Sequence, residues 1–272
     1  MSFDKKIFFI GAGNMGGAIL CALIDSGYPE RTIFFYEPNE DQACEIAEKS
    51  KAIRVASLSE GFSEADVVFL CLKPQIFSNI STLLNAELKK TDKRPIIISI
   101  MAGVKIATLH EIFQENAIIV RTMPNIAITV KKGIVAVATD NVKESVLQTV
   151  ESLFSTCANT IKILENQMDA VTGLSGSGPA FVFQFIEALA MGGVKMGLKR
   201  DVAMELALAT AAGSIEMLLK LNLCSNELTA NACSPAGTTI AGLQELENKA
   251  FRGIVMAAVE AAVNRSVELG KS

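Results

Sequence analysis

A short apolar run that leads directly into a glycine-rich turn is the feature that most constrains how this chain can fold. Residues 7–10 are followed by Gly11-Ala12-Gly13-Asn14-Met15-Gly16, and apolar residues then recur at helical spacing. In a strand–turn–helix unit, the first glycine permits a tight turn, the second lets backbone N–H groups approach a pyrophosphate, and the third lets the helix pack closely. The positive N-terminal end of the helix then points at the anion. We therefore predict a dinucleotide-binding unit, the alternative being a plain glycine-rich turn.

Residues 5 to about 164 alternate between apolar, β-rich runs and amphipathic stretches. We expect strands at 6–10, 32–36, 53–56, 67–72, 96–100, 118–122, 133–138 and 160–164. We expect helices at 14–26, 40–49, 75–85, 105–114 and 143–156. Such alternation predicts an α/β fold with a Rossmann-type doubly wound sheet and helices on both faces. The first domain, residues 1–164, is therefore predicted to bind a dinucleotide.

The sequence after residue 165 has no clear strand pattern. The stretch 251–263 has the one-face spacing of a helix, whereas 202–219 is apolar around much of the helix. A helix that is apolar on several sides must be buried on several sides, and a second subunit is the natural place to bury it in so small a lobe. We predict an all-α C-terminal domain over residues 165–272 that binds substrate and forms a homodimer.

Composition excludes several classes of function. The formal net charge is −4 and no basic run stands out, so a nucleic-acid partner is not expected. The six cysteines form no CxxC pair, which indicates reduced, mostly buried thiols in a cytosolic protein, and no Cys/His cluster suggests a metal site. No segment reaches the ~18 apolar residues of a membrane span, and the apolar run near the N-terminus is too short for a signal peptide. We expect a cytoplasmic protein without a membrane partner.

Glu37 ends the second expected strand, about 20 residues after Gly16, which is the spacing of a carboxylate that holds the adenosine ribose 2′-hydroxyl. Such a carboxylate repels a 2′-phosphate, so the residues alone favour NADH over NADPH. The alternative is a surface glutamate that opens the turn Glu37-Pro38-Asn39.

Three further loops follow expected strands: Lys73-Pro74, Ala102-Gly103 and Met123-Pro124-Asn125. In an open parallel sheet, ligands lie outside the carboxyl ends of the strands, so these loops should face the cofactor. Lys73 is a candidate for a cofactor phosphate or the substrate, and Asn125 for the nicotinamide side. The alternatives are a solvated lysine and an ordinary turn residue.

Two segments of the helical half are rich in glycine, proline and hydroxyl groups. Residues 173–181 contain three glycines that should break a helix, and Pro179 suits the first turn of the next one. Residues 231–239 lead into a helix expected from Thr238 to about Leu246. N–H groups and hydroxyls exposed at a helix start make a carboxylate site. Simple capping by Thr238 and Thr239 is the alternative.

On these residues the chain resembles the pyrroline-5-carboxylate reductase family. The most specific motif is Cys-Ser-Pro-Ala-Gly-Thr-Thr-Ile at 233–240, and the others are 169–181, 11–16, Lys73-Pro74 and Met123-Pro124-Asn125. The resemblance covers essentially the whole chain. It implies reduction of (S)-1-pyrroline-5-carboxylate to L-proline with NADPH or NADH, the final step of proline biosynthesis. It also implies a Rossmann domain followed by a helical domain that interlocks two subunits, with decamers in some members.

The resemblance also assigns residues to the imino-acid substrate. By position in the family motif, the substrate carboxylate is held by Ser234, Gly237, Thr238 and Thr239. Thr239 places a hydroxyl near the ring nitrogen and is the expected catalytic residue. Asn231 lies near cofactor and substrate, and Glu165 matches a family acidic residue near the substrate.

The chain departs from the family pattern at two positions. Many members carry Ser, Thr, Asn or Arg where Glu37 stands, so the choice between NADPH and NADH stays open. Ala236 stands where glycine is common, a small change that we expect to leave the loop intact.

Two alternative functions belong to other classes. A 3-hydroxyacid dehydrogenase has a similar glycine-rich turn but needs a catalytic lysine soon after a Gly-rich stretch, and no lysine follows Gly178 before Lys195. A non-catalytic nucleotide-binding regulator would be expected to lose the loop at 233–240, which is intact. The single histidine, His110, is predicted to be structural.

Overall fold

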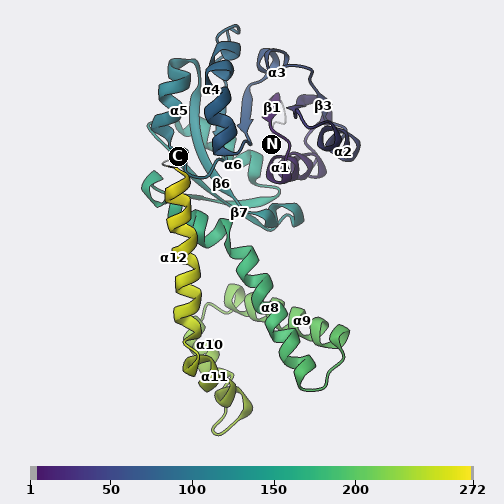
Figure 1. Ribbon diagram of the computed structural model, residues 1–272, viewed down its shortest axis with the longest axis vertical. Helices are drawn as coiled ribbons and strands as arrows, with labels where there is room; N and C mark the ends of the chain where they lie inside the picture. The colour runs from purple at the N-terminus through teal and green to yellow at the C-terminus, as the bar shows by residue number, and fades with distance from the viewer. Residues whose placement is uncertain (1–4, 271–272) are drawn as a thin grey trace. The chain divides into compact units, whose positions relative to one another are not determined.

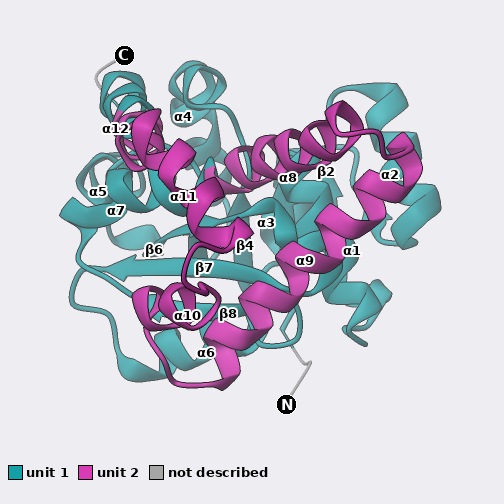
Figure 2. Ribbon diagram, turned by 90° about the horizontal axis from the view of Figure 1, so that it is seen from below, with its two compact units in different colours: residues 1–177, 261–272 teal, residues 178–260 magenta. Residues whose placement is uncertain are grey.

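The computed structural model of the protein describes residues 5–270. Contacts between Cα atoms divide the chain into two compact units, residues 1–177 with 261–272, and residues 178–260 (Figure 2). Residues 165–177 and the C-terminal stretch therefore belong with the unit that holds the sheet. The domain boundary at residue 164, drawn where strand-like sequence ends, stays a prediction.

The first unit contains one eight-stranded sheet in the order β3-β2-β1-β4-β5-β6-β7-β8 (Figure 1). The strands are β1 (Ile7–Ile10), β2 (Ile33–Tyr36), β3 (Ile53–Arg54), β4 (Val67–Leu70), β5 (Ile96–Ser99), β6 (Ile118–Pro124), β7 (Gly133–Thr139) and β8 (Ala158–Lys162). Neighbouring strands are parallel except for β6 and β7, which are antiparallel. All eight expected strands are present, and the α/β prediction is confirmed.

Helices cover both faces of this sheet, and each face has its own hydrophobic core. The helices of this unit are α1 (Asn14–Asp25), α2 (Glu40–Ser50), α3 (Leu58–Glu64), α4 (Pro74–Leu88), α5 (Ile106–Phe113), α6 (Glu144–Phe154) and α7 (Met168–Val171). Phe9 packs with Ile19 and Phe154 in one core, whereas its neighbour Phe8 packs with Phe62 and Phe113 in the other. Successive strand side chains point to opposite faces, so the buried run around β1 supplies both cores.

The sequence did not predict α3, which is only seven residues long and follows the short strand β3. The segment at 173–181 also differs from expectation. Residues Thr172–Gly176 form a π-helical turn, so the glycines widen the helical path instead of breaking it. Pro179 lies in the first turn of α8 (Gly178–Lys195), as predicted.

The second unit consists of helices that pack around a small core. It contains α8, α9 (Arg200–Lys220), α10 (Ser225–Asn231), α11 (Thr238–Asn248) and the first part of α12 (Phe251–Leu269). Its buried apolar side chains are Ala190, Ala203 and Ala207, while many large ones, such as Phe183 and Ile254, remain exposed. So much exposed apolar surface indicates a partner surface.

Two helical stretches, Glu165–Lys195 and Arg200–Lys220, are long and apolar enough to cross a membrane by length and composition alone. Neither stretch is an uninterrupted apolar run, so the sequence pattern did not predict them. Such helices are weak evidence for a membrane, and a buried interface between subunits accounts equally well for their composition.

The C-terminal end of α12 is fixed to the first unit. The Ser266 hydroxyl is buried and donates to Asp169 Oδ1 at 2.7 Å. Gly270 lies against Gly103, close enough that a Cβ built on Gly103 would lie 2.6 Å from the Gly270 Cα. Gly270 therefore packs against one of the loops expected at the cofactor site.

Candidate dinucleotide and substrate sites

The glycine-rich turn after β1 is shaped by close approach to β4. Gly11 has φ +90°, and a Cβ on it would lie 2.7 Å from the Cys71 carbonyl oxygen. A Cβ on Gly16 would lie 2.8 Å from the Cys71 Cβ and closer still to the Gly11 oxygen. These contacts are the predicted tight turn and close helix packing, and a side chain at either position would displace backbone.

Helix α1 begins in this turn with its positive end uncompensated. Gly13 is the N-cap and has no side chain with which to accept a hydrogen bond from the first N–H groups, and no acidic residue lies in the first turn. Unsatisfied N–H groups and the helix dipole together attract an anion. The start of α1 is thus suited to a phosphate group.

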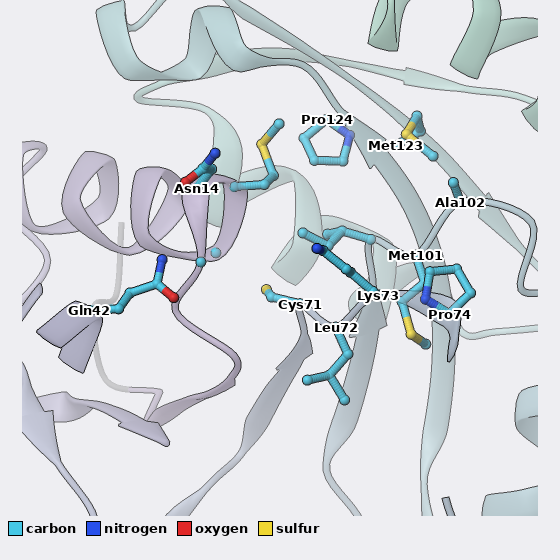
Figure 3. Close-up of a pocket in the computed structure, with 14 residues that line it drawn as sticks. Asn14, Gln42, Cys71, Leu72, Lys73, Pro74, Met101, Ala102, Met123 and Pro124 are labelled. Atoms are coloured by element: carbon cyan, nitrogen blue, oxygen red, sulfur yellow. The ribbon is translucent and has the colours of Figure 1, made fainter. Parts of the chain in front are cut away.

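A pocket of about 500 Å³ opens at the start of α1 (Figure 3). It is lined by Gly13, Asn14, Met15, Gly16, Gln42, Cys71, Leu72, Lys73, Pro74, Ile100, Met101, Ala102, Met123 and Pro124. These residues come from the turn after β1, from α2, and from the carboxyl ends of β4, β5 and β6. The structure thus brings together three loops that the sequence placed at one edge of the sheet.

Most of the predicted cofactor residues lie on this pocket or next to it. The predicted residues that line the pocket are Gly13, Asn14, Met15, Gly16, Lys73, Pro74 and Ala102. Ala12 lines an adjoining hollow between α1 and α2. Gly11, the first residue of the turn, lines neither space, because it packs against the Cys71 backbone. The contact of each of these residues with a cofactor stays a prediction.

Two predicted cofactor residues have structural roles instead of lining the pocket. Gly103 has φ +77° and packs against Gly270. Asn125 Oδ1 accepts from the Ile134 N–H at 3.2 Å and so ties the loop after β6 to β7. The predicted contact between Asn125 and the nicotinamide stays a prediction.

Glu37 is buried beside the glycine-rich turn, with 9% of its surface exposed. Its Oε2 accepts from the Ala12 N–H at 2.9 Å, and its Oε1 accepts from the Asn39 N–H at 3.0 Å. Glu37 also lines a second pocket, of about 490 Å³, together with Arg54. The carboxylate therefore joins the end of β2 to the turn and still borders open space.

Sequence reasoning missed several residues of the first pocket. Leu72, Ile100 and Met101 extend strands whose following loops were predicted, so position in the strand could have identified them. Gln42 is in the first half of α2, about 4 Å from where a Gly13 Cβ would lie, and only the folded chain brings it there. Cys71 packs against Gly16. Burial raises the pKa of the Cys71 thiol well above the ordinary value.

The cysteines are all free among the residues that the structure describes, as predicted. The expectation that they are mostly buried was wrong. Cys157 is buried, and burial raises its pKa to about 11, but Cys44 and Cys224 are exposed. Both exposed cysteines lie on or beside short surface helices, which the sequence pattern did not distinguish from core positions.

In the described part of the chain, no group of His, Cys, Asp and Glu is arranged to hold a metal ion.

The predicted substrate segment forms a tight turn followed by a helix start. The Gly237 N–H donates to the Ser234 carbonyl oxygen at 3.0 Å, with Pro235 and then Ala236 between them. Proline at the second position and a positive φ at the third are typical of a type II turn. Ala236 has φ +57°, a conformation that favours glycine. The loop keeps its turn as expected, but alanine adopts it at an energetic cost.

This turn delivers the predicted substrate residues to the beginning of α11. Gly237 is the N-cap without a side-chain cap, Thr238 and Thr239 are the first two helical residues, and no acidic residue lies in the first turn. Asn231 is the last residue of α10. The helix start is thus free of a competing anion, which suits a substrate carboxylate.

Glu165 is occupied by protein groups in the first unit. Its Oε1 accepts from the Ile106 N–H at 2.6 Å and from Arg121 Nη1 at 3.1 Å. Arg121 is 2% exposed, and its Nε and Nη2 have no hydrogen-bond partner among the described residues. The predicted contact of Glu165 with substrate stays a prediction, since the carboxylate already neutralises a buried guanidinium.

Two family models match the chain. One, described as pyrroline-5-carboxylate reductase dimerisation, matches residues 165–269, and the other, NADP oxidoreductase coenzyme F420-dependent, matches residues 6–103. The first therefore spans the predicted helical domain, and the second spans the strands and loops that build the pocket up to Gly103.

Known proteins of similar sequence match over almost the whole chain. A pyrroline-5-carboxylate reductase of Synechocystis sp. is 40% identical, with 98% of each chain covered. One of Arabidopsis thaliana is 39% identical over 98% of this chain and 96% of its own. The crystal structure of Plasmodium falciparum pyrroline carboxylate reductase with NADP bound has a TM-score of 0.89 and 32% identity, covering 98% of both chains.

Proposed function

The chain belongs to the pyrroline-5-carboxylate reductase family, and from this premise we propose which residues carry out its reaction. It is an oxidoreductase that acts on a CH–NH group. It uses NADPH or NADH to reduce (S)-1-pyrroline-5-carboxylate to L-proline, the last step of proline biosynthesis. The observation that carries the residue assignment is that α1 and α11 both begin at a glycine, without a side-chain cap or an acid in the first turn.

The residues at the start of α1 fit a dinucleotide. Its pyrophosphate suits the N–H groups at the start of α1, from Gly13 to Gly16, where no side chain caps the helix and no acidic residue lies in the first turn. We propose that the rest of the cofactor is contacted by Lys73, Pro74, Ala102, Gly103 and Asn125. The adenosine ribose is proposed to bind at Glu37. When bound, the cofactor supplies a hydride to the imine carbon. The protein's task is to hold it in one orientation.

The substrate carboxylate is proposed to bind at the start of α11. The N–H groups of Thr238 and Thr239, together with the hydroxyl of Ser234, are donors that suit an anion, and Gly237 as the N-cap has no side chain to compete for them. Thr239 is proposed to present its hydroxyl to the ring nitrogen, and Asn231 to border the substrate. Glu165 is proposed as a substrate-binding residue from the family resemblance alone.

The reaction needs little acid–base catalysis from the protein. A pyrroline nitrogen that arrives protonated is already an iminium and accepts hydride at the adjacent carbon. Orientation and anchoring of the carboxylate are therefore the main contributions of the chain. The single histidine, His110, lies exposed on α5, which agrees with a reaction that needs no imidazole.

Oxidation of NADPH or NADH by purified protein with pyrroline-5-carboxylate tests the proposal. Thr239→Ala should lower kcat while the affinity for cofactor stays unchanged, because the hydroxyl acts on the ring nitrogen. Thr229→Ala is a matched control on α10, where the hydroxyl donates to the Ser225 carbonyl within the helix. Normal turnover and substrate affinity in the Thr239 variant would remove that residue from the mechanism.

The two alternative functions lack support from the site. A 3-hydroxyacid dehydrogenase needs a lysine early in the first helix of the second domain, whereas Lys195 is the last residue of α8. A non-catalytic regulator has no use for the intact turn from Ser234 to Gly237 and would show no oxidation of the cofactor with the imine.

The chain self-associates through its helical dimerisation domain. We propose that it acts in the cytoplasm as a homodimer, with the decamer that some family members form as the alternative assembly. The exposed apolar side chains of the second unit support a subunit interface. Light scattering after size-exclusion chromatography measures the number of chains. A monomer would contradict self-association, and a dimer at high concentration would exclude the decamer.

A further inference from the structure

An ion pair borders the pocket that contains Glu37. Arg54 ends the short strand β3, and its two terminal nitrogens donate to the two carboxylate oxygens of Glu40, each at 2.7 Å. Glu40 is the first residue of α2. The geometry is the bidentate fork in which arginine also recognises phosphate.

Strand pairing places Arg54 next to the position expected for the adenosine ribose. In the parallel pair of β2 and β3, Arg54 is opposite Phe35. Phe35 lies two residues before Glu37 in the sequence. Arg54 and Glu37 line the same pocket with Tyr36, Pro38, Val55 and Ala56. Arg54 supplies the positive charge among these residues, and Glu37 the negative charge.

The pair is accessible and electrostatically balanced. The side chains of Arg54 and Glu40 are 34% and 70% exposed. The guanidinium holds the pKa of the Glu40 carboxyl below its usual range, mainly through the hydrogen bonds, so the pair stays charged at neutral pH. An exposed pair of this kind is weak, so Arg54 can take another anion once Glu40 is removed.

We propose that Glu40 is a specificity-determining residue for the cofactor, because it occupies the Arg54 guanidinium that a 2′-phosphate would otherwise bind. The inference rests on the proposed cofactor site, with the adenosine ribose at Glu37. Glu37 and Glu40 then act by different means. Glu37 repels a 2′-phosphate directly, whereas Glu40 withholds the cation that would attract it. The natural chain therefore favours NADH.

Binding of adenosine 2′,5′-bisphosphate and of 5′-AMP tests the inference without any turnover. Glu40→Gln should raise affinity for the bisphosphate relative to AMP about tenfold, the gain expected from one charge-assisted contact. The ratio of kcat/KM for NADPH to that for NADH should rise in parallel. In the double variant Glu40→Gln/Arg54→Ala, the gain should disappear, because the cation is gone.

A matched control separates the pairing of Glu40 with Arg54 from the general effect of removing one negative charge. Asp41→Asn removes the same charge from the same exposed helical turn and leaves the Glu40–Arg54 pair in place, so it should change the bisphosphate-to-AMP ratio much less. Glu40→Ala repeats the test should the glutamine amide itself bond to Arg54. Thermal melting confirms that each variant is folded.

Three results would overturn the inference: an unchanged ratio in both Glu40 variants, an equal rise in Asp41→Asn, or a gain that survives loss of Arg54. Failure of the proposed function gives a different result, since wild-type protein would then bind neither dinucleotide or would not reduce the imine. Normal imine reduction with an unmoved ratio would refute the Glu40 inference alone.

Discussion

Replacing Glu165 by alanine separates two roles for this residue. In the structure, Glu165 Oε1 accepts from Arg121 Nη1 and from the Ile106 N–H, which is the first N–H of α5. The N-cap of α5, Lys105, makes no side-chain cap bond. Glu165 therefore caps a helix from outside and neutralises a buried cation. We expect Glu165→Ala to reduce stability much more than substrate affinity.

The expected loss follows from burial and from the two hydrogen bonds. Removing one partner of a fully buried ion pair costs about 3–5 kcal/mol, and losing a helix N-cap costs about 1 kcal/mol. The Arg121 side chain is 3% exposed, but that of Glu165 is 31% exposed, so water partly screens the pair. We therefore expect a net loss of about 2–3 kcal/mol. For a chain of this size, that lowers the melting temperature by roughly 4–6 °C.

The assay combines thermal unfolding with steady-state kinetics on the same samples. Glu165→Gln keeps an oxygen for the Ile106 N–H but loses the charge, so it should lose less stability than the alanine variant. Adding Arg121→Met to Glu165→Gln should recover stability, because no uncompensated charge is then left buried. A direct role at the substrate predicts the opposite pattern. Wild-type melting of Glu165→Ala, with a KM for the imine raised at least about tenfold, would refute the structural reasoning.

Three further predictions use other positions. Ala236→Gly should stabilise the protein by about 0.5–1 kcal/mol, because relief of the left-handed conformation exceeds the added entropy of the unfolded chain; an unchanged unfolding midpoint would contradict this. Gly16→Ala should weaken binding of NADPH and NADH alike by about tenfold, since its methyl meets the Gly11 carbonyl oxygen and Cys71. Gly17→Ala should have a milder effect in the same fluorescence titration, because its methyl meets mainly the flexible end of the Ile46 side chain and lies 3.0 Å from the Ala12 oxygen. Glu37→Ser should shift the kcat/KM ratio toward NADPH; a constant ratio would argue against the ribose assignment.

The sequence alone determined the sheet, the glycine-rich turn and the helical second half. Each depends on signals that are local along the chain. Gly11 has a backbone conformation that side chains disfavour, and the buried run around β1 can only be a central strand with neighbours on both faces. The motif at 233–240 likewise folds into a turn and a helix start within a few residues.

Only the tertiary structure decided which polar groups meet. Glu165 and Arg121 are 44 residues apart, and Glu37 bonds to an N–H 25 residues away. Strand order likewise brings Arg54 beside Glu37, and the C-terminal residues of α12 return to the loop at Gly103. Periodicity specifies which face of an element is buried, but not which element it faces. Long-range contacts between charged side chains therefore become visible only once the sheet and its helices are assembled.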